Sequence, residues 1–251
     1  MVTATTTRPE VFFSFFMFTA DLQPDNPAYT EVIARHMREL SSYGYDGFDL
    51  PIAPTSATDH RAEIQSYVNL RHRLEDLDLG EVRITTNVAT TRRFDPTSPH
   101  REQRDAALSY HHHMGTGVMT REETDRLMAG TDPSSVHLCL DTGHAAFAGF
   151  DPLDLAKTYA DRIGHVHLKD VRPEVVAMAH EQSLSFQQAI EAGVFTVPGD
   201  GSIDFVPILQ ALADSGYEGW LIVEAEQDPA KSVPLEYAFK ARRYLREVLG
   251  W

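Results

Sequence analysis

The chain has 251 residues, of which 42% are hydrophobic and 24% charged, a balance typical of one globular domain and not of disordered or fibrous proteins. Its 22 Lys and Arg against 37 Asp and Glu give a net charge of -15 at pH 7. Such a charge repels a phosphate backbone, so we expect no nucleic-acid partner. The longest apolar stretch, over 11–18, is shorter than the roughly 20 residues of a membrane-spanning helix, and no signal-peptide core is present. We therefore expect a cytoplasmic protein without membrane contact.

The first ten residues are polar and lack periodicity, which predicts a disordered leader over 1–10 and a single domain over 11–251. From Val11 onward, short apolar runs alternate with longer amphipathic segments. The apolar runs predict seven strands, over 11–18, 47–52, 82–88, 107–114, 136–141, 163–170 and 220–226. The amphipathic segments predict six helices, over 29–43, 60–77, 121–128, 152–160, 205–215 and 235–249.

Regular alternation of apolar strands with helices predicts a parallel sheet covered on both faces. No glycine-rich phosphate loop follows the first strand, and polar residues follow at least five strands, which favours a closed barrel over an open sheet. Residues 89–104 are polar and interrupted by proline, so they supply no eighth strand. The predicted fold is α/β, of (β/α)8 TIM-barrel type, with one βα unit near residues 89–106 missing or replaced.

Histidine, aspartate and glutamate occur at the ends of four predicted strands. Alternate residues of a strand share a face, which groups His165 with His167 and Lys169 on one strand. Barrel enzymes keep their active sites at the carboxyl ends of the strands. The sequence therefore predicts a metal site whose ligands are His111, Asp141, His167 and Glu224.

Two imidazoles and two carboxylates suit Mn²⁺, Co²⁺, Zn²⁺ or Fe²⁺. The alternative for each histidine is an ordinary polar residue at a strand end. The alternative for Asp141 is a cap of the turn that follows it.

Other residues carry weaker signals. Asp49 ends the second predicted strand and Arg172 follows the sixth, so either side chain could reach a substrate; the alternatives are a turn-forming aspartate and a surface salt bridge. The glycine-rich stretch 197–205 is predicted as a βα connection in preference to an anion cradle. Cys139 is the single cysteine, and its apolar neighbours predict a buried, unreactive thiol.

Five motifs resemble those of the inosose dehydratases, within the superfamily of xylose-isomerase-like TIM barrels that also contains sugar isomerases and epimerases. The motifs are YHHHMGTG (110–117), LDTGHA (140–145), GHVHLKDVRPEV (164–175), GVFTVPGDG (193–201) and GWLIVEAEQDP (219–229). Upstream, FFMFTADLQPDNPAY and GYDGFDLPIAP are more similar to sugar isomerases and ketose 3-epimerases. We therefore divide the domain into an epimerase-like part, 11–106, and an inosose-dehydratase-like part, 107–251, as in a recombined or shortened barrel.

The resemblance implies the same four metal ligands, with His111 in place of a carboxylate of the family. It also implies that His144 supports the site and that Arg172 contacts the substrate. In the epimerases two metal-bound glutamates face each other as an acid-base pair, and a histidine at position 111 breaks that symmetry. Elimination of water needs no such symmetry.

We expect a metal-dependent dehydratase acting on a cyclic polyol ketone of the 2-keto-myo-inositol type, through a metal-stabilised enediolate. The expected cofactor is Mn²⁺ or Co²⁺, with Zn²⁺ or Fe²⁺ as the alternative. Glu224, His144 or His113 is the expected base, and Lys169 or a histidine the expected acid. The residues expected to contact the substrate, a small sugar or inositol-derived ketone, are Asp49, His165 and Arg172.

Three other functions remain open. A ketose isomerase or epimerase fits the fold and the first part of the chain. A DNA repair enzyme similar to endonuclease IV would need a basic groove, which the acidic composition disfavours. A catalytically silent, shortened barrel would expose strand edges and associate into a homo-oligomer.

Overall fold

A computed structural model describes residues 10–14, 18, 27–52, 60–86 and 108–250, to which all structural statements refer. The predicted βα gap near 89–106 lies outside the described residues, as does the predicted leader except for its last residue, Glu10. The carbonyl oxygen of Glu10 accepts a hydrogen bond of 3.0 Å from the backbone N–H of Leu221. This bond ties the start of the described chain to the last strand of the sheet.

One seven-stranded sheet organises the molecule, in the order β3-β2-β1-β9-β6-β5-β4, and every neighbouring pair is parallel. Each predicted strand segment supplies one of its members. The strands are β1 (Val11–Ser14), β2 (Gly47–Ile52), β3 (Glu81–Thr86), β4 (Leu108–His111), β5 (Val136–Asp141), β6 (Ile163–Leu168) and β9 (Leu221–Val223).

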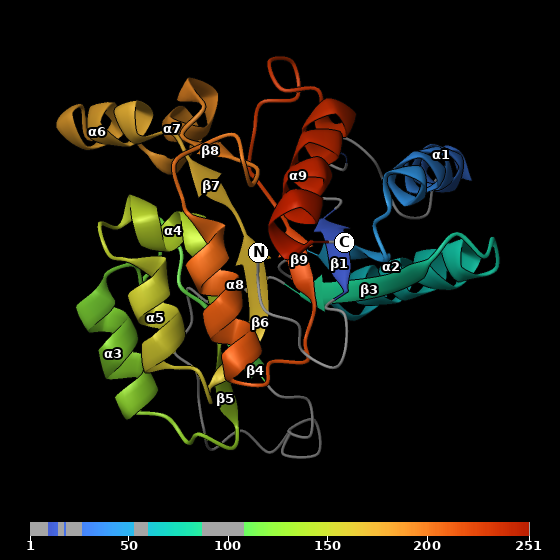
Figure 1. The fold of residues 1–251 in the computed structure, drawn as a ribbon. Helices are drawn as coiled ribbons and strands as arrows, with labels where there is room; N and C mark the ends of the chain where they lie inside the picture. The colour runs from blue at the N-terminus through green and yellow to red at the C-terminus, as the bar shows by residue number, and fades with distance from the viewer. Residues whose placement is uncertain (1–9, 15–17, 19–26, 53–59, 87–107, 251) are drawn as a thin grey trace.

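Helices connect the strands and lie around the sheet (Figure 1). All six predicted helices are present: α1 (Pro27–Tyr43), α2 (His60–Glu75), α3 (Arg121–Ala129), α5 (Pro152–Thr158), α8 (Phe205–Asp214) and α9 (Pro234–Leu249). The predicted start of α8 is also confirmed, because the Asp204 side chain caps it by accepting from Val206 N. The α/β prediction is therefore confirmed.

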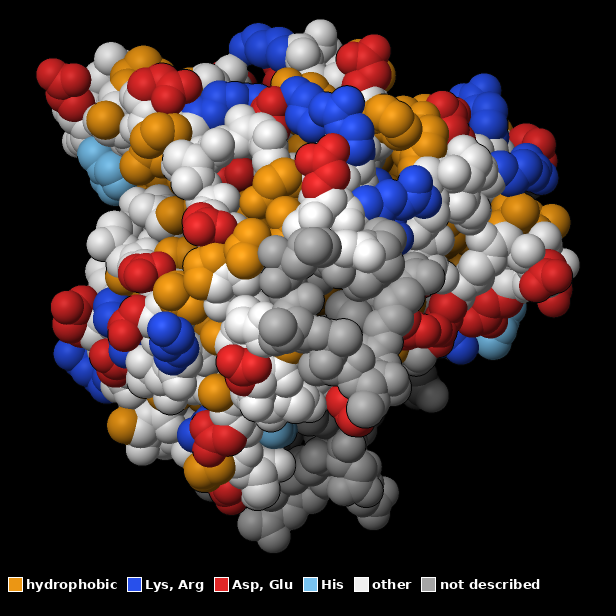
Figure 2. Space-filling model, viewed as in Figure 1, with side chains coloured by type: hydrophobic (Ala, Val, Ile, Leu, Met, Phe, Trp, Pro, Cys, Tyr) orange, Lys and Arg blue, Asp and Glu red, His pale blue; other side chains and the backbone are white. Residues whose placement is uncertain are grey.

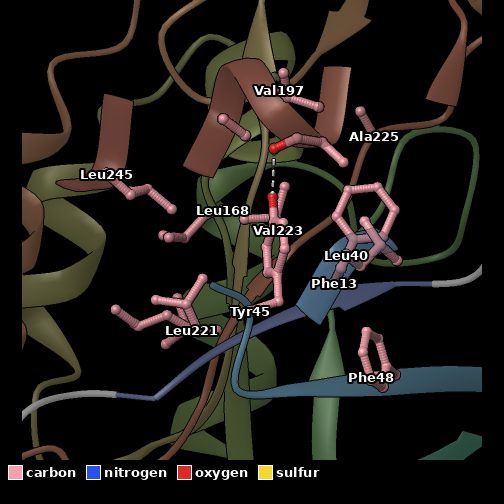
Figure 3. Close-up of a cluster of buried hydrophobic side chains, with 14 of the residues drawn as sticks. Phe13, Leu40, Tyr45, Phe48, Leu168, Val197, Leu221, Val223, Ala225 and Leu245 are labelled. Atoms are coloured by element: carbon pink, nitrogen blue, oxygen red, sulfur yellow. Dashed lines mark hydrogen bonds between the residues drawn. The ribbon is translucent and has the colours of Figure 1, made fainter. Parts of the chain in front are cut away.

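Alternation along the strands divides the side chains between two environments. Leu221, Val223 and Ala225 belong to one buried apolar cluster with Leu245 of α9 (Figure 3). The Tyr45 hydroxyl donates a hydrogen bond of 2.8 Å to the Ala238 carbonyl within the same cluster. Because residues 223 and 225 face the helices, residues 224 and 226 face the opposite side of the sheet.

The outer surface of the helices is polar. In the space-filling view, acidic and basic side chains are interspersed over α3 and α9, with apolar side chains between them (Figure 2). This is the pattern of helices that bury one face against a sheet and leave the other to solvent. In the described part of the chain, no helix is both long enough and apolar enough to cross a membrane.

The sequence missed a small unit between β6 and α8. It contains the antiparallel pair β7 (Asp170–Val171) and β8 (Phe195–Thr196), with α6 (Pro173–Glu181) and α7 (Phe186–Ala192) between them. Side chains of this unit, among them Val171, Ala189 and Phe195, belong to a second apolar cluster. The short helix α4 (Thr142–Phe147), which follows β5 directly, was not predicted either.

Asp170 holds the glycine-rich loop that follows β8. Its carboxylate accepts hydrogen bonds from the backbone N–H groups of Gly199, Gly201, Ser202 and Ile203, at 2.9 to 3.3 Å. A Cβ at Gly201 would meet the carboxylate oxygen Oδ1 at 2.4 Å, so only glycine permits the approach. These amides are therefore engaged within the protein, which supports the prediction of a βα connection here.

We expect Asp170→Ala to lower the free energy of unfolding by about 2–4 kcal/mol, because it leaves four backbone N–H donors of part-buried hydrogen bonds without their acceptor. Urea denaturation followed by circular dichroism measures this loss. The matched control is Asp161→Ala, since Asp161 is exposed and its replacement should change stability by less than about 0.5 kcal/mol. Equal stability of the two variants would contradict the proposed anchoring role of Asp170.

Candidate active site

Asp141, His167 and Glu224 meet at the carboxyl end of the central strands. The register pairs Asp141 of β5 with His167 of β6, and Leu168 of β6 with Val223 of β9, one residue before Glu224. Each of the three side chains offers a ligand atom, and these atoms lie within 4.8 Å of one another. All three residues are buried.

His111 joins this group from β4. Its Nε2 lies 3.1 Å from Asp141 Oδ2, and its ring centroid lies 4.8 Å from that of His167. Burial lowers the pKa of His111 although Asp141 opposes the shift, so a neutral ring donates Nε2–H to the carboxylate. The structure thus brings the four sequence-predicted metal residues together.

The two oxygens of the Asp141 carboxylate make different contacts. Its Oδ1 accepts a hydrogen bond of 2.8 Å from His144 N and caps α4. Its Oδ2 is the oxygen that faces His111 and lies 3.4 Å from His167 Nδ1. The capping role considered from sequence is therefore present, and the second oxygen of the same carboxylate faces the candidate metal residues.

Lys169 is fully buried among carboxylates. Its Nζ lies 3.1 Å from Asp141 Oδ2, 3.1 Å from Glu224 Oε1 and 2.7 Å from Glu226 Oε2. Burial favours the neutral amine, but the three carboxylates outweigh it and raise the pKa of Lys169. A Cβ at Gly143 would meet Lys169 Cγ at 2.5 Å, which explains the glycine of the LDTGH motif.

The carboxylates are ionised in return. Burial by itself would raise the pKa of Asp141 and of Glu224, but Lys169 lies beside both, His167 lies beside Glu224, and the pKa of each is lowered. Burial likewise opposes ionisation of Glu226, and Lys169 outweighs it. A buried ammonium thus permits three buried carboxylates to stay charged at neutral pH.

Glu226 is the site residue that the sequence analysis left unassigned. Its Oε1 lies 3.4 Å from the Nε2 atoms of both His113 and His144, and the three residues form a second group with ligand atoms within 4.8 Å. The available signal was alternation, because Glu226 is two residues after Glu224 and shares its face.

Hydrogen bonds determine the tautomers of the two histidines beside Glu226. His113 Nδ1 lies 2.7 Å from the Met114 carbonyl oxygen, which only accepts, so Nδ1 carries a proton and Nε2 is the nitrogen left to exchange one. His144 Nδ1 accepts from Met114 N at 3.3 Å, so its Nε2 carries the proton and faces Glu226. Burial and the nearby Lys169 lower the pKa of His144 to about 3, which keeps this ring neutral.

The donor set formed by Asp141, His167 and Glu224 fits a divalent cation. Carboxylate oxygens and one imidazole suit Mn²⁺, Co²⁺, Zn²⁺ and Fe²⁺. Nδ1 of His167 is buried and makes no well-aligned hydrogen bond in the described part of the chain, although it lies 3.4 Å from Asp141 Oδ2 and from Glu224 Oε1. Such a nitrogen is available as a ligand.

The three residues predicted to contact substrate lie in different surroundings. Asp49 is buried on β2, where the Ser14 hydroxyl lies 3.4 Å from its Oδ2. His165 is on β6 with its ring 5.0 Å from that of His167. Arg172 donates to Asp200 at 2.7 Å and to the Gly193 carbonyl at 2.7 Å. Its guanidinium therefore holds the β8 loop, and a substrate contact stays a prediction.

His112 faces away from the site and is buried against Phe150, with ring centroids 5.6 Å apart. Neither ring nitrogen has a hydrogen-bond partner in the described part of the chain. Burial lowers its pKa from 6.5 to about 3. An unfolded chain therefore binds a proton at this position over a pH range in which the folded protein does not.

We expect this histidine to make the protein sensitive to acid. Stability is fully present above the unfolded pKa of 6.5 and is lost as pH falls toward the folded pKa of about 3, by about 1.4 kcal/mol per pH unit for one such proton. Urea denaturation of His112→Leu between pH 7 and pH 4 should show a shallower decline than the unsubstituted protein. The exposed His72 provides the control: His72→Leu should leave the slope unchanged, and equal slopes for all three proteins would contradict the assignment.

Comparisons with known proteins agree with this fold. A family model described as xylose isomerase-like TIM barrel matches residues 108–248. The inosose dehydratase of Clostridium tetani is 56% identical over 146 residues, which are 58% of this chain and 49% of that protein. The chain thus spans about half the length of the curated relatives it matches, and the resemblance found in the sequence is confirmed.

Solved structures show the same fold at low identity. The structure of a putative sugar phosphate isomerase/epimerase from Anabaena variabilis ATCC 29413 aligns with a TM-score of 0.65 and 20% identity. The alignment covers 97% of this chain and 99% of that one. The structure of the IOLI protein with a bound zinc atom aligns with a TM-score of 0.53 and 15% identity. The alignment covers 96% of this chain and 98% of that one. The TIM-barrel prediction is confirmed, and the chain belongs to the xylose isomerase-like TIM barrel family.

Proposed function

We propose that this protein is a metal-dependent hydro-lyase that removes water from a cyclic polyhydroxy ketone of the 2-keto-myo-inositol type. The observation that carries the proposal is a metal donor set, Asp141, His167 and Glu224, joined through the Lys169 ammonium to a second group that contains His113, His144 and Glu226. The 56% sequence identity with an inosose dehydratase supports the same chemistry and extends over about half of that protein.

Asp141, His167 and Glu224 would hold the cation, with His111 beside them. The zinc atom in the IOLI structure supports a divalent ion in this fold. When bound, such an ion supplies Lewis-acid polarisation of the ketone. Mn²⁺ and Co²⁺ are the ions that we expect first, because the set is richer in oxygen than in soft ligands.

His113 is the proposed acid-base group. Its side chain is 21% exposed while Glu226 is 4% exposed, so the imidazole ring is open to a substrate whereas the carboxylate is enclosed. Nε2 removes the proton from the carbon beside the ketone, and the electron pair of the broken C–H bond forms a C=C bond. The hydroxyl on the next carbon leaves and takes the proton back from His113, which yields water.

Other residues of the cluster position His113. Glu226 Oε1, 3.4 Å from Nε2, stabilises the imidazolium that forms in the transition state. His144 and Lys169 hold Glu226 from its other sides. The raised pKa of Lys169 makes it a fixed positive charge and a poor proton donor, so we assign it this holding role in preference to the acid role expected from sequence.

Incubation with 2-keto-myo-inositol and Mn²⁺ or Co²⁺ in D₂O tests the proposal by mass spectrometry. Loss of water from the ketone supports the hydro-lyase. Deuterium incorporation without loss of water would show an isomerase or epimerase instead. No change in the ketone with metal bound would favour the catalytically silent barrel.

We expect His113→Asn to lower kcat by at least about 100-fold, the usual contribution of a general acid-base group, with a smaller change in KM. Steady-state kinetics at saturating metal measures both constants. The exposed His72 of α2 again gives the matched control, since His72→Asn should retain full activity. A His113→Asn variant with the kcat of the unsubstituted protein would exclude His113 and direct attention to Glu224.

A further inference from the structure

We infer that Cys139 is a metal ligand in a second coordination mode of this centre, in which it binds thiophilic divalent cations such as Zn²⁺ or Co²⁺ together with His111 and His167. The inference rests on the proposed metal site and extends it. Cys139 lies on β5 two residues before Asp141, so both side chains face the same side of the sheet. The sequence had predicted an unreactive core thiol.

Pairing between strands brings the three ligands together. Cys139 is directly opposite His111 of β4, and His167 of β6 is opposite Asp141. The thiol of Cys139 and one ring nitrogen from each of the two histidines lie within 4.8 Å of one another. Tetrahedral Zn²⁺, with bonds of about 2.3 Å to sulfur and 2.0 Å to nitrogen, places its ligand atoms ~3.5 Å apart. Small side-chain rotations that move the ligand atoms by about 1 Å close this difference.

Imidazole nitrogens without a well-aligned hydrogen bond lie near Cys139. His167 Nδ1 is buried without a well-aligned hydrogen bond, and so is His165 Nε2, in the part of the chain that the structure describes. The register pairs His165 directly with Cys139. Buried polar atoms are ordinarily hydrogen-bonded, and two such nitrogens beside a thiol form a ready set of soft ligands.

The two modes differ in the cations they favour. Mn²⁺ prefers oxygen, so it would use Asp141 and Glu224, whereas Zn²⁺ and Co²⁺ accept sulfur readily. His167 belongs to both sets. The two modes therefore share a ligand, and only one of them is occupied at a time. In the second mode the S–H bond of Cys139 is replaced by a sulfur–metal bond, and the thiol proton is released to solvent.

Titration of metal-free protein with Co²⁺, in a phosphine reductant that contains no thiol, tests the inference. We expect a thiolate-to-cobalt charge-transfer band in the near ultraviolet that saturates at one ion per chain. Cys139 is the single cysteine, so the band has no other source in the protein. Cys139→Ser should remove the band and weaken Zn²⁺ binding about 10-fold or more, while Mn²⁺ affinity changes by less than about twofold.

A second measurement needs no variant. In mild denaturant, Zn²⁺ should slow alkylation of Cys139 in the unsubstituted protein more than an equally saturating concentration of Mn²⁺ does. Bound Co²⁺ that shows only visible d–d bands, together with equal protection by the two ions, would overturn the role of Cys139 and leave the proposed function intact. Absence of Co²⁺ binding would overturn the role of Cys139, and absence of Mn²⁺ binding as well would overturn the proposed function too.

Discussion

Replacing Asp141 by asparagine is expected to weaken Mn²⁺ and Co²⁺ binding by at least about 100-fold and to abolish turnover. Asparagine keeps an oxygen that accepts the 2.8 Å hydrogen bond from His144 N, so the cap of α4 is preserved. The charge beside His111, His167 and Lys169 is removed, and an NH2 donor replaces the Oδ2 acceptor that faces them. Isothermal titration calorimetry with each ion measures the loss of affinity.

The control for this variant is Asp151→Asn. Asp151 caps the neighbouring helix α5 in the same way, by accepting from Leu153 N at 2.8 Å, but it is exposed. Asp151→Asn should leave affinity and activity unchanged, which separates loss of a ligand from loss of a helix cap. Metal affinity retained in Asp141→Asn would refute the site, whatever happened to activity.

Replacing Lys169 by methionine should destabilise the metal-free protein by about 3–5 kcal/mol at neutral pH, as expected when one partner of a buried ion pair is removed. Methionine resembles lysine in length, and three carboxylates that now contact the Lys169 ammonium would stay buried without a counter-charge. Urea denaturation at pH 7 measures the loss. Lys157→Met provides a control, because Lys157 is exposed on α5.

The pH dependence of this loss follows from the direction of the pKa shifts. In the unsubstituted protein the pKa values of Asp141 and Glu224 are lowered, so these groups contribute stability above their unfolded values that is lost as pH falls. Without Lys169, burial raises their pKa, and stability should instead increase as pH falls toward 5. Added Mn²⁺ should also stabilise Lys169→Met more than the unsubstituted protein. A variant as stable as Lys157→Met at pH 7 would contradict the role given to this ammonium.

Local geometry made much of the fold and site predictable. A period of two on the strands and of 3.6 on the helices depends only on neighbouring residues. It located all seven strands of the large sheet and six of the helices. The same alternation put His165, His167 and Lys169 on one face. The elements between β6 and α8 were missed, and length alone does not explain it, because α6 and α7 have the same nine and seven residues as α3 and α5, which were predicted.

Contacts between distant residues were beyond that reasoning. Arg172 was predicted to contact the substrate, and its bonds to Asp200 and to the Gly193 carbonyl could not be foreseen from the sequence. Glu226 received no role because its neighbours His113 and Lys169 come from strand ends more than 50 residues earlier in the chain. Cys139 was interpreted as core because its apolar neighbours in sequence say nothing about the histidines opposite it.

By itself, the sequence determined the alternation of strands and helices, the face on which each strand residue lies, and the chemical types of the candidate ligands. Only the tertiary structure decided which of these residues meet. The β5–β6 register opposes Asp141 and His167, and the direct pairing of β6 with β9 brings Glu224 to them. Side-chain direction follows from the local backbone, whereas distances between strands follow from register and strand order, which the packing of the whole chain sets.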